Sequence, residues 1–346
     1  MSNFFDATAD LAGGLLRLGW YTGIGEMAGV IAARTGHEPP RVRRAVPGQR
    51  EVLTDILDLL RRDAELVRSG AAVAGGEPAA GLVDHLNRIR ALMADVPGAI
   101  ARRRNATTRT GAEQTSTAGL PDYYAQDFHF QDGGYLTERS ARLYDVQVET
   151  LFRGTAFAMR RQALGPIAEF VRGRDQRHLS LLDVACGTGR FLREARCSYP
   201  AMTLIGLDLS RAYLSEAERH LSGLRRVTGL EANAESIPLP NASQDIVTCI
   251  YLFHELPPEV RRIVAAEIGR VLKPGGLFVF IDSLQLGDRT GGWDGFLEGF
   301  PERFHEPYYR HYLIDDLDRV FANVGLLAQA TWFAFLSKVM VRRKPE

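Results

Sequence analysis

Paired cysteines are missing from this chain of 346 residues. Its three cysteines, Cys186, Cys197 and Cys249, are odd in number, lie far apart and form no CxxC pair. A disulfide framework needs an even set of cysteines, and a structural zinc site usually draws on closely spaced pairs. The sequence therefore indicates neither, and it predicts a protein of a reducing compartment, which we take to be the cytoplasm.

An excess of charge of either sign is also missing. The 42 Lys and Arg residues balance the 42 Asp and Glu residues, so the formal net charge is +0. Proteins that bind DNA or RNA neutralise phosphates and normally carry a basic excess. Nucleic acid is therefore not an expected partner, and we expect a small-molecule substrate.

The chain has no long uninterrupted apolar run. The longest apolar stretch near the N-terminus is broken by Arg17 and Glu26, and no basic segment leads into an apolar stretch at the start. The sequence thus predicts neither a membrane span nor a signal peptide. Its length and its 45% hydrophobic content allow one large domain with a full core and a smaller one beside it.

Apolar residues recur every three or four positions in the first hundred residues. The repeat runs through 50–68 and 84–100 and predicts amphipathic helices of a bundle. We assign residues 1–104 to a helical region that either covers the site or pairs two protomers as a homodimer. Residues 105–121 lose the repeat, are rich in Thr, Ala and Gly, and predict a linker to a second domain over 122–346.

A glycine turn follows a short apolar run at residues 181–190, which read LLDVACGTGR. Glycine lets the main chain pass close to a charged or ribose-bearing ligand, so the turn indicates a nucleotide-like cofactor. The dinucleotide fingerprint would require Gly or Ala at position 192, where the chain has Leu192, and NAD is therefore disfavoured. Asp183 could meet a ligand ammonium, and Asp208, about 20 residues beyond the turn, can accept both ribose hydroxyls.

Five motifs recur in a fixed order over residues 181–286. They are Asp183-Val-Ala-Cys-Gly-Thr-Gly189, Gly206-Leu-Asp-Leu-Ser210, Ala232-Asn-Ala-Glu-Ser-Ile-Pro238, Gln244-Asp-Ile-Val247 and Leu272-Lys-Pro-Gly-Gly276. In this order and spacing the segment resembles the class I S-adenosylmethionine-dependent methyltransferases, in the group that includes the quinone-biosynthesis C-methyltransferases. Two positions depart from the family pattern: Ala185 replaces the usual glycine, and Asn233 replaces the usual aspartate.

The resemblance implies S-adenosyl-L-methionine as the cofactor and a set of residues around it. Asn233 can still serve at the adenine edge, because its carbonyl accepts a hydrogen bond from an exocyclic amine. The implied cofactor-binding residues are Asp183, Ala185, Gly187, Gly189, Asp208, Leu209, Asn233, Ala234, Leu252 and Tyr135.

Strand and helix patterns alternate from residue 181 onward, which is typical of a parallel sheet covered on both faces, with ligands at the carboxyl ends of the strands. With the resemblance, this predicts an α/β fold: a doubly wound, Rossmann-like, seven-stranded sheet of the class I methyltransferase type, with an all-helical N-terminal region. One long helix is expected over 139–172. The expected strands are 181–184, 203–208, 227–232, 246–252, 277–282, 326–335 and 337–342, the last two forming a closing hairpin.

An aromatic segment at 122–135 lies just ahead of that helix. In the resembled fold this segment passes over the cofactor, and Tyr135 could attract the cationic sulfur through its ring, with Phe130 beside the substrate. The alternative is that these aromatic residues only hold the helical region to the sheet. For Tyr123 and Tyr124 the structural role is favoured.

A His-Glu pair follows the fourth expected strand. His254 could act as a general base, with Glu255 orienting it or binding a substrate ammonium, but both could equally form only the pocket wall. A second polar group follows the fifth strand. The spacing of His305, Glu306 and His311 matches no metal-ligand pattern, so no metal is expected. The further candidates for contact with the substrate, or for packing, are Asp282, Tyr308 and Tyr309.

Three classes of function fit these features. The first is methyl transfer to a small molecule by in-line displacement, in which the protein holds the nucleophile opposite the sulfur. The second is an intramolecular cyclase that makes azetidine-2-carboxylate from the cofactor itself and releases methylthioadenosine. The third is a non-catalytic cofactor-binding module whose helical region recruits a partner. The products formed from the cofactor alone distinguish them.

Overall fold

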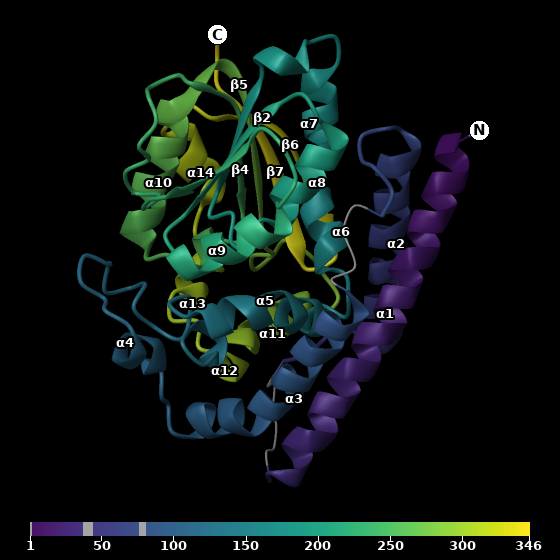
Figure 1. Ribbon diagram of the computed structural model, residues 1–346, viewed down its shortest axis with the longest axis vertical. Coiled ribbons are helices and arrows are strands. Elements are labelled where there is room, and N and C mark those ends of the chain that lie inside the picture. The colour runs from purple at the N-terminus through teal and green to yellow at the C-terminus, as the bar shows by residue number, and fades with distance from the viewer. Residues whose placement is uncertain (1, 37–43, 76–80) are drawn as a thin grey trace.

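The computed structural model describes residues 2–36, 44–75 and 81–346. A sheet with helices on both faces forms one part of the molecule, and the N-terminal helices lie along its side and lower edge (Figure 1). Within the described ranges, no helix is both long enough and apolar enough to cross a membrane.

The sheet has seven strands in the order β3-β2-β1-β4-β5-β7-β6. Strands β1 to β5 are parallel to one another, and β7 is antiparallel to both β5 and β6. The predicted doubly wound fold with its closing hairpin is confirmed. The strands are β1 (Ser180–Val184), β2 (Thr203–Asp208), β3 (Val227–Glu231), β4 (Gln244–Ile250), β5 (Leu272–Ser283), β6 (Leu327–Ala334) and β7 (Ser337–Arg343).

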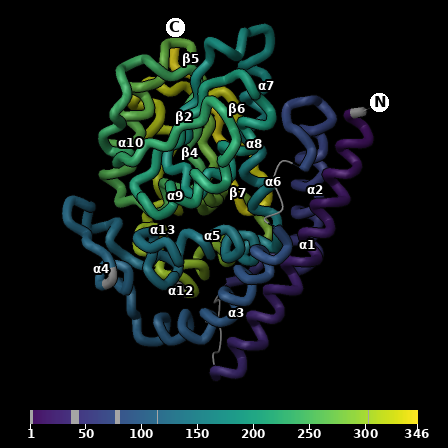
Figure 2. The backbone as a smooth tube through the Cα atoms, in the orientation of Figure 1, coloured from purple at the N-terminus to yellow at the C-terminus, as the bar shows by residue number. Residues whose placement is uncertain are grey.

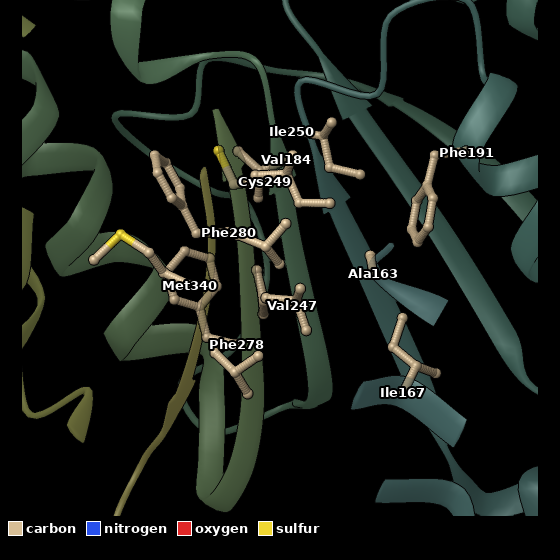
Figure 3. Packing of buried hydrophobic residues seen from close by; sticks show 14 of the residues in the cluster. Ala163, Ile167, Val184, Phe191, Val247, Cys249, Ile250, Phe278, Phe280 and Met340 are labelled. Atoms are coloured by element: carbon tan, nitrogen blue, oxygen red, sulfur yellow. The ribbon is translucent and has the colours of Figure 1, made fainter. Parts of the chain in front are cut away.

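The central strands are apolar on both sides because both faces of the sheet are covered. In Figure 1, α7 (Leu164–Val171) and α8 (Arg190–Ser198) lie on one face, and α10 (Pro258–Val271) and α14 (Leu317–Ala322) lie on the other. The close view in Figure 3 shows the buried side chains of β4, β5 and β7 between these layers, among them Phe278, Phe280 and Met340. This core fixes the strand ends at which a site can form.

Short helices lie across the lower edge of the sheet in Figure 1, where the parallel strands end. The insertion between β5 and α14 supplies α11 (Trp293–Glu298), α12 (Phe300–Arg303) and α13 (Tyr309–Tyr312). Two 3₁₀ turns, η1 (Phe128–Phe130) and η3 (Phe253–Glu255), and α9 (Arg211–His220) complete this edge. A third 3₁₀ turn, η2 (Gln176–His178), precedes β1.

The N-terminal region consists of α1 (Ser2–Arg34), α2 (Gln49–Arg68) and α3 (Leu82–Arg104). Figure 2 shows α1 along the outer side of the molecule, with α2 between it and the sheet domain. Ile56, Leu59 and Leu60 of α2 are buried in the same hydrophobic cluster as the sheet. The helical region therefore shares a core with the rest of the chain.

The segment predicted as a linker, 105–121, contains the single-turn helix α4 (Thr110–Gln114). The buried carboxylate of Asp127 accepts hydrogen bonds from the backbone N–H of Thr110, at 2.6 Å, and of Gly111, at 3.0 Å. These contacts fix the segment to the start of the aromatic stretch.

The prediction of one helix over 139–172 is wrong. The structure has α5 (Glu138–Leu151), α6 (Ala156–Arg161) and α7 in its place. Gly154, in the first break, has φ +79°, and a Cβ there would lie 2.7 Å from the carbonyl oxygen of Arg17. The break is thus the point where α1 approaches the chain too closely for any side chain.

The first parallel strands begin and end close to prediction, but β4 ends at Ile250 because Tyr251 turns the chain with φ 59°.

A buried ion cluster joins the helical region to the sheet domain. Arg161 is fully buried, and its guanidinium lies 3.1 Å from Asp10 of α1, 3.1 Å from Asp63 of α2 and 4.0 Å from Glu194 of α8. Burial raises the pKa of Asp63 well above its usual value, although Arg161 opposes this. Arg161 is therefore the cation that allows three carboxylates to be buried together.

We predict that Arg161→Met lowers the free energy of unfolding by about 3–5 kcal/mol, because it leaves buried carboxylates without their partner. Urea denaturation followed by circular dichroism measures the change. Arg61→Met is the matched control, since the Arg61–Asp58 pair is exposed on both sides, at 65% and 52%, and its loss should cost less than about 1 kcal/mol. Equal effects of the two substitutions would contradict the role given to Arg161.

Candidate functional site

One pocket lies at the carboxyl ends of β1, β2 and β4. It has about 720 Å³ of free space, including its open mouth, within the range of small-molecule sites. Nine residues predicted for the site line it: Tyr135, Ala185, Gly187, Asp208, Leu209, Asn233, Ala234, Leu252 and Glu255. Residues that were not assigned to the site also line it, including Tyr144, Tyr213 and Tyr251.

The turn between β1 and α8 forms one wall of the pocket. Ala185 and Gly187 have φ 59° and 54°, in the left-handed region. A Cβ added at Gly187 would meet nothing within 4 Å, so the backbone here faces open space. Gly189 has a different role: a Cβ there would lie 3.0 Å from Ala217 of α9. Gly189 allows helix packing and is not among the described residues that line the pocket.

Asp208 ends β2 and is fixed by the backbone. Its two carboxylate oxygens accept hydrogen bonds from the N–H of Gly187 and of Ser210, each at 2.8 Å. Burial raises the pKa of Asp208 to about 6, although these N–H groups oppose the shift. The two N–H groups thus orient the carboxylate. Each oxygen keeps a further lone pair that can accept a hydrogen bond from a ribose hydroxyl.

Asn233 and Ala234 line the pocket beyond β3. The side-chain carbonyl of Asn233 accepts from the N–H of Glu235 at 2.9 Å, and its amide donates to the Glu235 carboxylate at 3.0 Å. Tyr123 donates to the same carboxylate at 2.7 Å. The carbonyl of Asn233 is thus fixed in direction and keeps one lone pair for the predicted adenine contact.

Asp183 lies away from the pocket in the part of the chain that the structure describes. It is buried opposite Thr248 in the β1–β4 register, and the Thr248 hydroxyl donates to it at 2.7 Å. Burial raises the pKa of Asp183 to about 7. The contact with Thr248 accounts for the buried carboxyl of Asp183, and its expected contact with a ligand ammonium stays a prediction.

Several tyrosine rings line the pocket. Tyr135 and Tyr144 each lie edge-to-face with Tyr213, at centroid distances of 5.3 and 5.2 Å, and Tyr124 stacks with Tyr135 at 6.2 Å. Burial raises the pKa of Tyr124 and of Tyr135, so these phenols are neutral. Electron-rich faces grouped in this way attract a cation. The predicted structural role for Tyr123 and Tyr124 is incomplete, since both line the pocket.

Glu255 is the second pocket-lining carboxylate among the described residues, after Asp208. Tyr135 donates a hydrogen bond to it from the aromatic segment 122–135, which we call the lid. The Nε2 atom of His254 lies 3.7 Å from Glu255, and the Nδ1 atom of His254 is 2.6 Å from Asp282. Burial alone would lower the pKa of His254, but the Asp282 carboxylate outweighs this effect and raises the pKa to about 9. His254 is thus largely protonated at neutral pH, which disfavours it as a general base.

The other predicted residues lie behind this wall, outside the lining of the described pocket. Asp282 is fully buried and also accepts from the N–H of Phe253 at 2.8 Å. Tyr309 shares a hydrogen bond of 2.6 Å with Ser283, and the Phe130 ring lies 5.7 Å from that of His305. For Asp282, Phe130, Tyr308 and Tyr309 the packing alternative therefore fits better than direct contact with the substrate.

We predict that Asp208→Ala weakens binding of S-adenosylhomocysteine about 30-fold or more, since it removes a charge-assisted acceptor. Titration calorimetry measures the affinity. Glu231→Ala is the control, because Glu231 is exposed and pairs with Asp208 in the strand register. Binding by the native protein should also weaken below pH 6, because Asp208, with its pKa of about 6, becomes protonated there. Unchanged affinity in Asp208→Ala would rule out this pocket as the ribose site.

Comparison with known proteins gives similarities over part of the chain. The family described as "Methyltransferase domain" matches residues 181–276. The ubiquinone/menaquinone biosynthesis C-methyltransferase of Syntrophotalea carbinolica is 32% identical over 156 residues, which are 45% of this chain and 62% of that protein. The demethylmenaquinone methyltransferase of Lactococcus lactis is 37% identical over 108 residues, 30% of this chain and 42% of that protein. The chain thus spans less than two thirds of each of these relatives.

Solved structures with a similar arrangement include a SAM dependent methyltransferase from Aquifex aeolicus. It has 19% sequence identity and a TM-score of 0.40, and the match covers 52% of this chain and 88% of that one. The geranyl diphosphate C-methyltransferase from Streptomyces coelicolor has 17% identity and a TM-score of 0.40, covering 53% of this chain and 77% of that one.

Proposed function

Since the chain contains a class I S-adenosylmethionine-dependent methyltransferase domain, with S-adenosylmethionine as its cofactor, we propose that it transfers the methyl group to a small-molecule acceptor. The pocket carries this proposal: an oriented Asp208 and an open glycine turn lie on one side, and neutral tyrosines and Glu255 lie on the other. The cofactor supplies an electrophilic methyl group, and the protein holds the acceptor in line with it.

The pocket residues fit such a cofactor. Asp208 would hold the ribose, and Asn233 would contact the adenine edge. The open space in front of Gly187 leaves room for the ligand next to the turn. The rings of Tyr135 and Tyr213 would stabilise the sulfonium, because cations are attracted to aromatic faces.

Glu255 is our candidate for the residue that contacts the acceptor. It lines the pocket and is oriented by the Tyr135 hydroxyl. A carboxylate there can take a proton from an oxygen or carbon acid, or hold a substrate ammonium. His254 lies next to Glu255 and is held by Asp282. We therefore assign His254 as a residue that positions Glu255.

The names of the relatives suggest the class of acceptor. Two of them methylate precursors of ubiquinone or menaquinone, and one of 34% identity is named as a malonyl-acyl carrier protein O-methyltransferase. We propose an acceptor whose carbon or oxygen becomes nucleophilic on losing a proton, which would use the carboxylate of Glu255.

We predict that the native protein forms S-adenosylhomocysteine only when an acceptor is added. The first acceptors to test are quinols, alcohols and carboxylates, and mass spectrometry identifies the products. Methylthioadenosine formed from the cofactor alone would overturn the proposal and indicate intramolecular cyclisation. Release of neither product with any acceptor, despite tight binding, would indicate a non-catalytic module.

In the same assay, Glu255→Gln should lower turnover by about 10²–10⁴, the usual range for losing a general base, while the affinity for the cofactor stays within about threefold. Glu259→Gln is the matched control, because Glu259 is exposed on the neighbouring helix α10. Full turnover by Glu255→Gln would show that the acceptor needs no deprotonation by this residue.

We also propose that the chain forms a homodimer through α1. This helix is apolar around most of its circumference, and one side of it is uncovered. Phe5 is 69% exposed, Leu16 is 76% exposed and Val30 is 54% exposed. An apolar surface of this extent on an outer helix is typical of a protein interface.

Leu16→Glu should therefore convert the dimer into a monomer, because it would place a charge in the apolar interface. Light scattering after gel filtration measures the mass. Ile314→Glu provides the control, since Ile314 is 73% exposed outside the helical region. A native protein that is monomeric at all concentrations tested would refute the dimer.

A further inference from the structure

Three segments that are distant in the sequence meet beside the pocket. His129 comes from η1, Glu255 from η3 and Glu306 from the loop between α12 and α13. Each offers one ligand atom, and these atoms all lie within 4.8 Å of one another. Glu255 lines the pocket, so the cluster forms part of its wall. We refer to His129, Glu255 and Glu306 as the wall cluster.

The ligand atoms of the wall cluster lie close enough for one ion to bring them together after local movement. His129 Nδ1 lies 3.0 Å from the Glu306 carboxylate, and His129 Nε2 lies 3.5 Å from Glu255. Each acid thus faces a different nitrogen of the ring, and an imidazole binds one ion through one nitrogen only. Two ligands that each lie about 2.1 Å from a zinc ion are about 3.0–3.5 Å apart, so one carboxylate must move toward the nitrogen that the other acid faces.

Glu306 is buried with an incomplete set of partners. Its side chain is fully covered, and one carboxylate oxygen lies 3.0 Å from His129 Nδ1. Neither oxygen has a well-aligned hydrogen-bond partner among the described residues. Buried carboxylates are normally paired, hydrogen-bonded or bound to a metal. The oxygen of Glu306 that does not face His129 is therefore free to bind a ligand.

The charge of the wall cluster leads to the same conclusion. With His129 protonated, one cation faces two carboxylates, and the three residues carry a net charge of −1. The neighbouring pair of His254 and Asp282, which lies 3.7 Å from Glu255, is neutral as a pair and leaves this charge unchanged. A divalent cation bound by a neutral imidazole and two carboxylates gives a net charge of zero, which is favoured at a buried site.

The backbone at His129 is held in a strained conformation. His129 and Phe130 have φ 58° and 55°, and two consecutive non-glycine residues in the left-handed region are uncommon. The N–H of His129 donates to the carbonyl of His305 at 3.1 Å, so η1 is fixed to the segment that carries Glu306. Strain of this kind persists where the surrounding structure requires a side chain in one place.

We propose that His129, Glu255 and Glu306 bind one divalent first-row transition-metal ion in the wall of the pocket. A mixed imidazole and carboxylate set suits Zn²⁺, Fe²⁺ or Mn²⁺. An ion there would join the lid, the end of β4 and the insertion, and it could bind an acceptor oxygen and lower the pKa of that oxygen. This binding site does not depend on the proposed methyl transfer, and an ion there would replace the free carboxylate of Glu255 as the group that activates the acceptor.

The test uses the full-length protein, stripped with a chelator and dialysed. Titration calorimetry with ZnCl₂ or MnCl₂ alone should show one ion per chain, and mass spectrometry of the gel-filtered protein should show the same stoichiometry. Glu306→Gln and His129→Gln should each weaken binding by about 100-fold or more, the upper end of losses for residues around a metal. His311→Gln, which changes an exposed histidine nearby, should bind as the native protein does.

The affinity of each variant for S-adenosylhomocysteine, measured without metal, reports whether the pocket has folded. A native protein that binds neither metal would overturn the proposal, and the wall cluster would then be an ion pair of His129 with two acids. Binding that is unchanged in Glu306→Gln would also overturn it. Failure to find an acceptor would bear only on the proposed function.

Discussion

Partners for buried charges determine how the described parts of this chain fit together. Arg161 joins carboxylates from α1, α2 and α8 in the interior. Asp208 is fixed by two backbone N–H groups, and Asp282 by His254 and a further N–H. Because an unpaired buried charge costs several kcal/mol, these contacts fix the helical region, the glycine turn and the strand ends in one arrangement. Of these residues, Asp208 lines the pocket.

The sequence predicts those parts of the site whose chemistry is local. The glycine turn and Asp208 can be recognised because ligands of parallel sheets bind at the carboxyl ends of the strands. Both lie within a few residues of such an end. The same reasoning does not assign a role to Asp183, because its position at a strand end does not show that its carboxyl accepts a hydrogen bond from Thr248. The broken helix is a similar case. A single glycine, Gly154, is compatible with a continuous helix until α1 is placed against it.

The remaining site residues depend on long-range packing. Tyr144 and Tyr213 occupy helical positions that look like ordinary core, and only the fold brings their rings together over the pocket. His129 and Glu306 are separated by most of the second domain, and neither has a local motif. A signal was present in the dense aromatic stretch before the first strand, but the sequence could not show which of its residues face inward.

Helix α1 has a consequence for the order in which the molecule forms. Its 33 residues include Gly13, Gly14, Gly19, Gly23, Gly25 and Gly29, and each glycine costs a helix up to about 1 kcal/mol relative to alanine. Such a helix has little stability of its own and depends on packing. Asp10 of α1 pairs with Arg161, which lies 151 residues later in the chain. During synthesis, α1 is therefore made well before the partner that it needs, and it must stay in an extended or fluctuating state until α6 has been made.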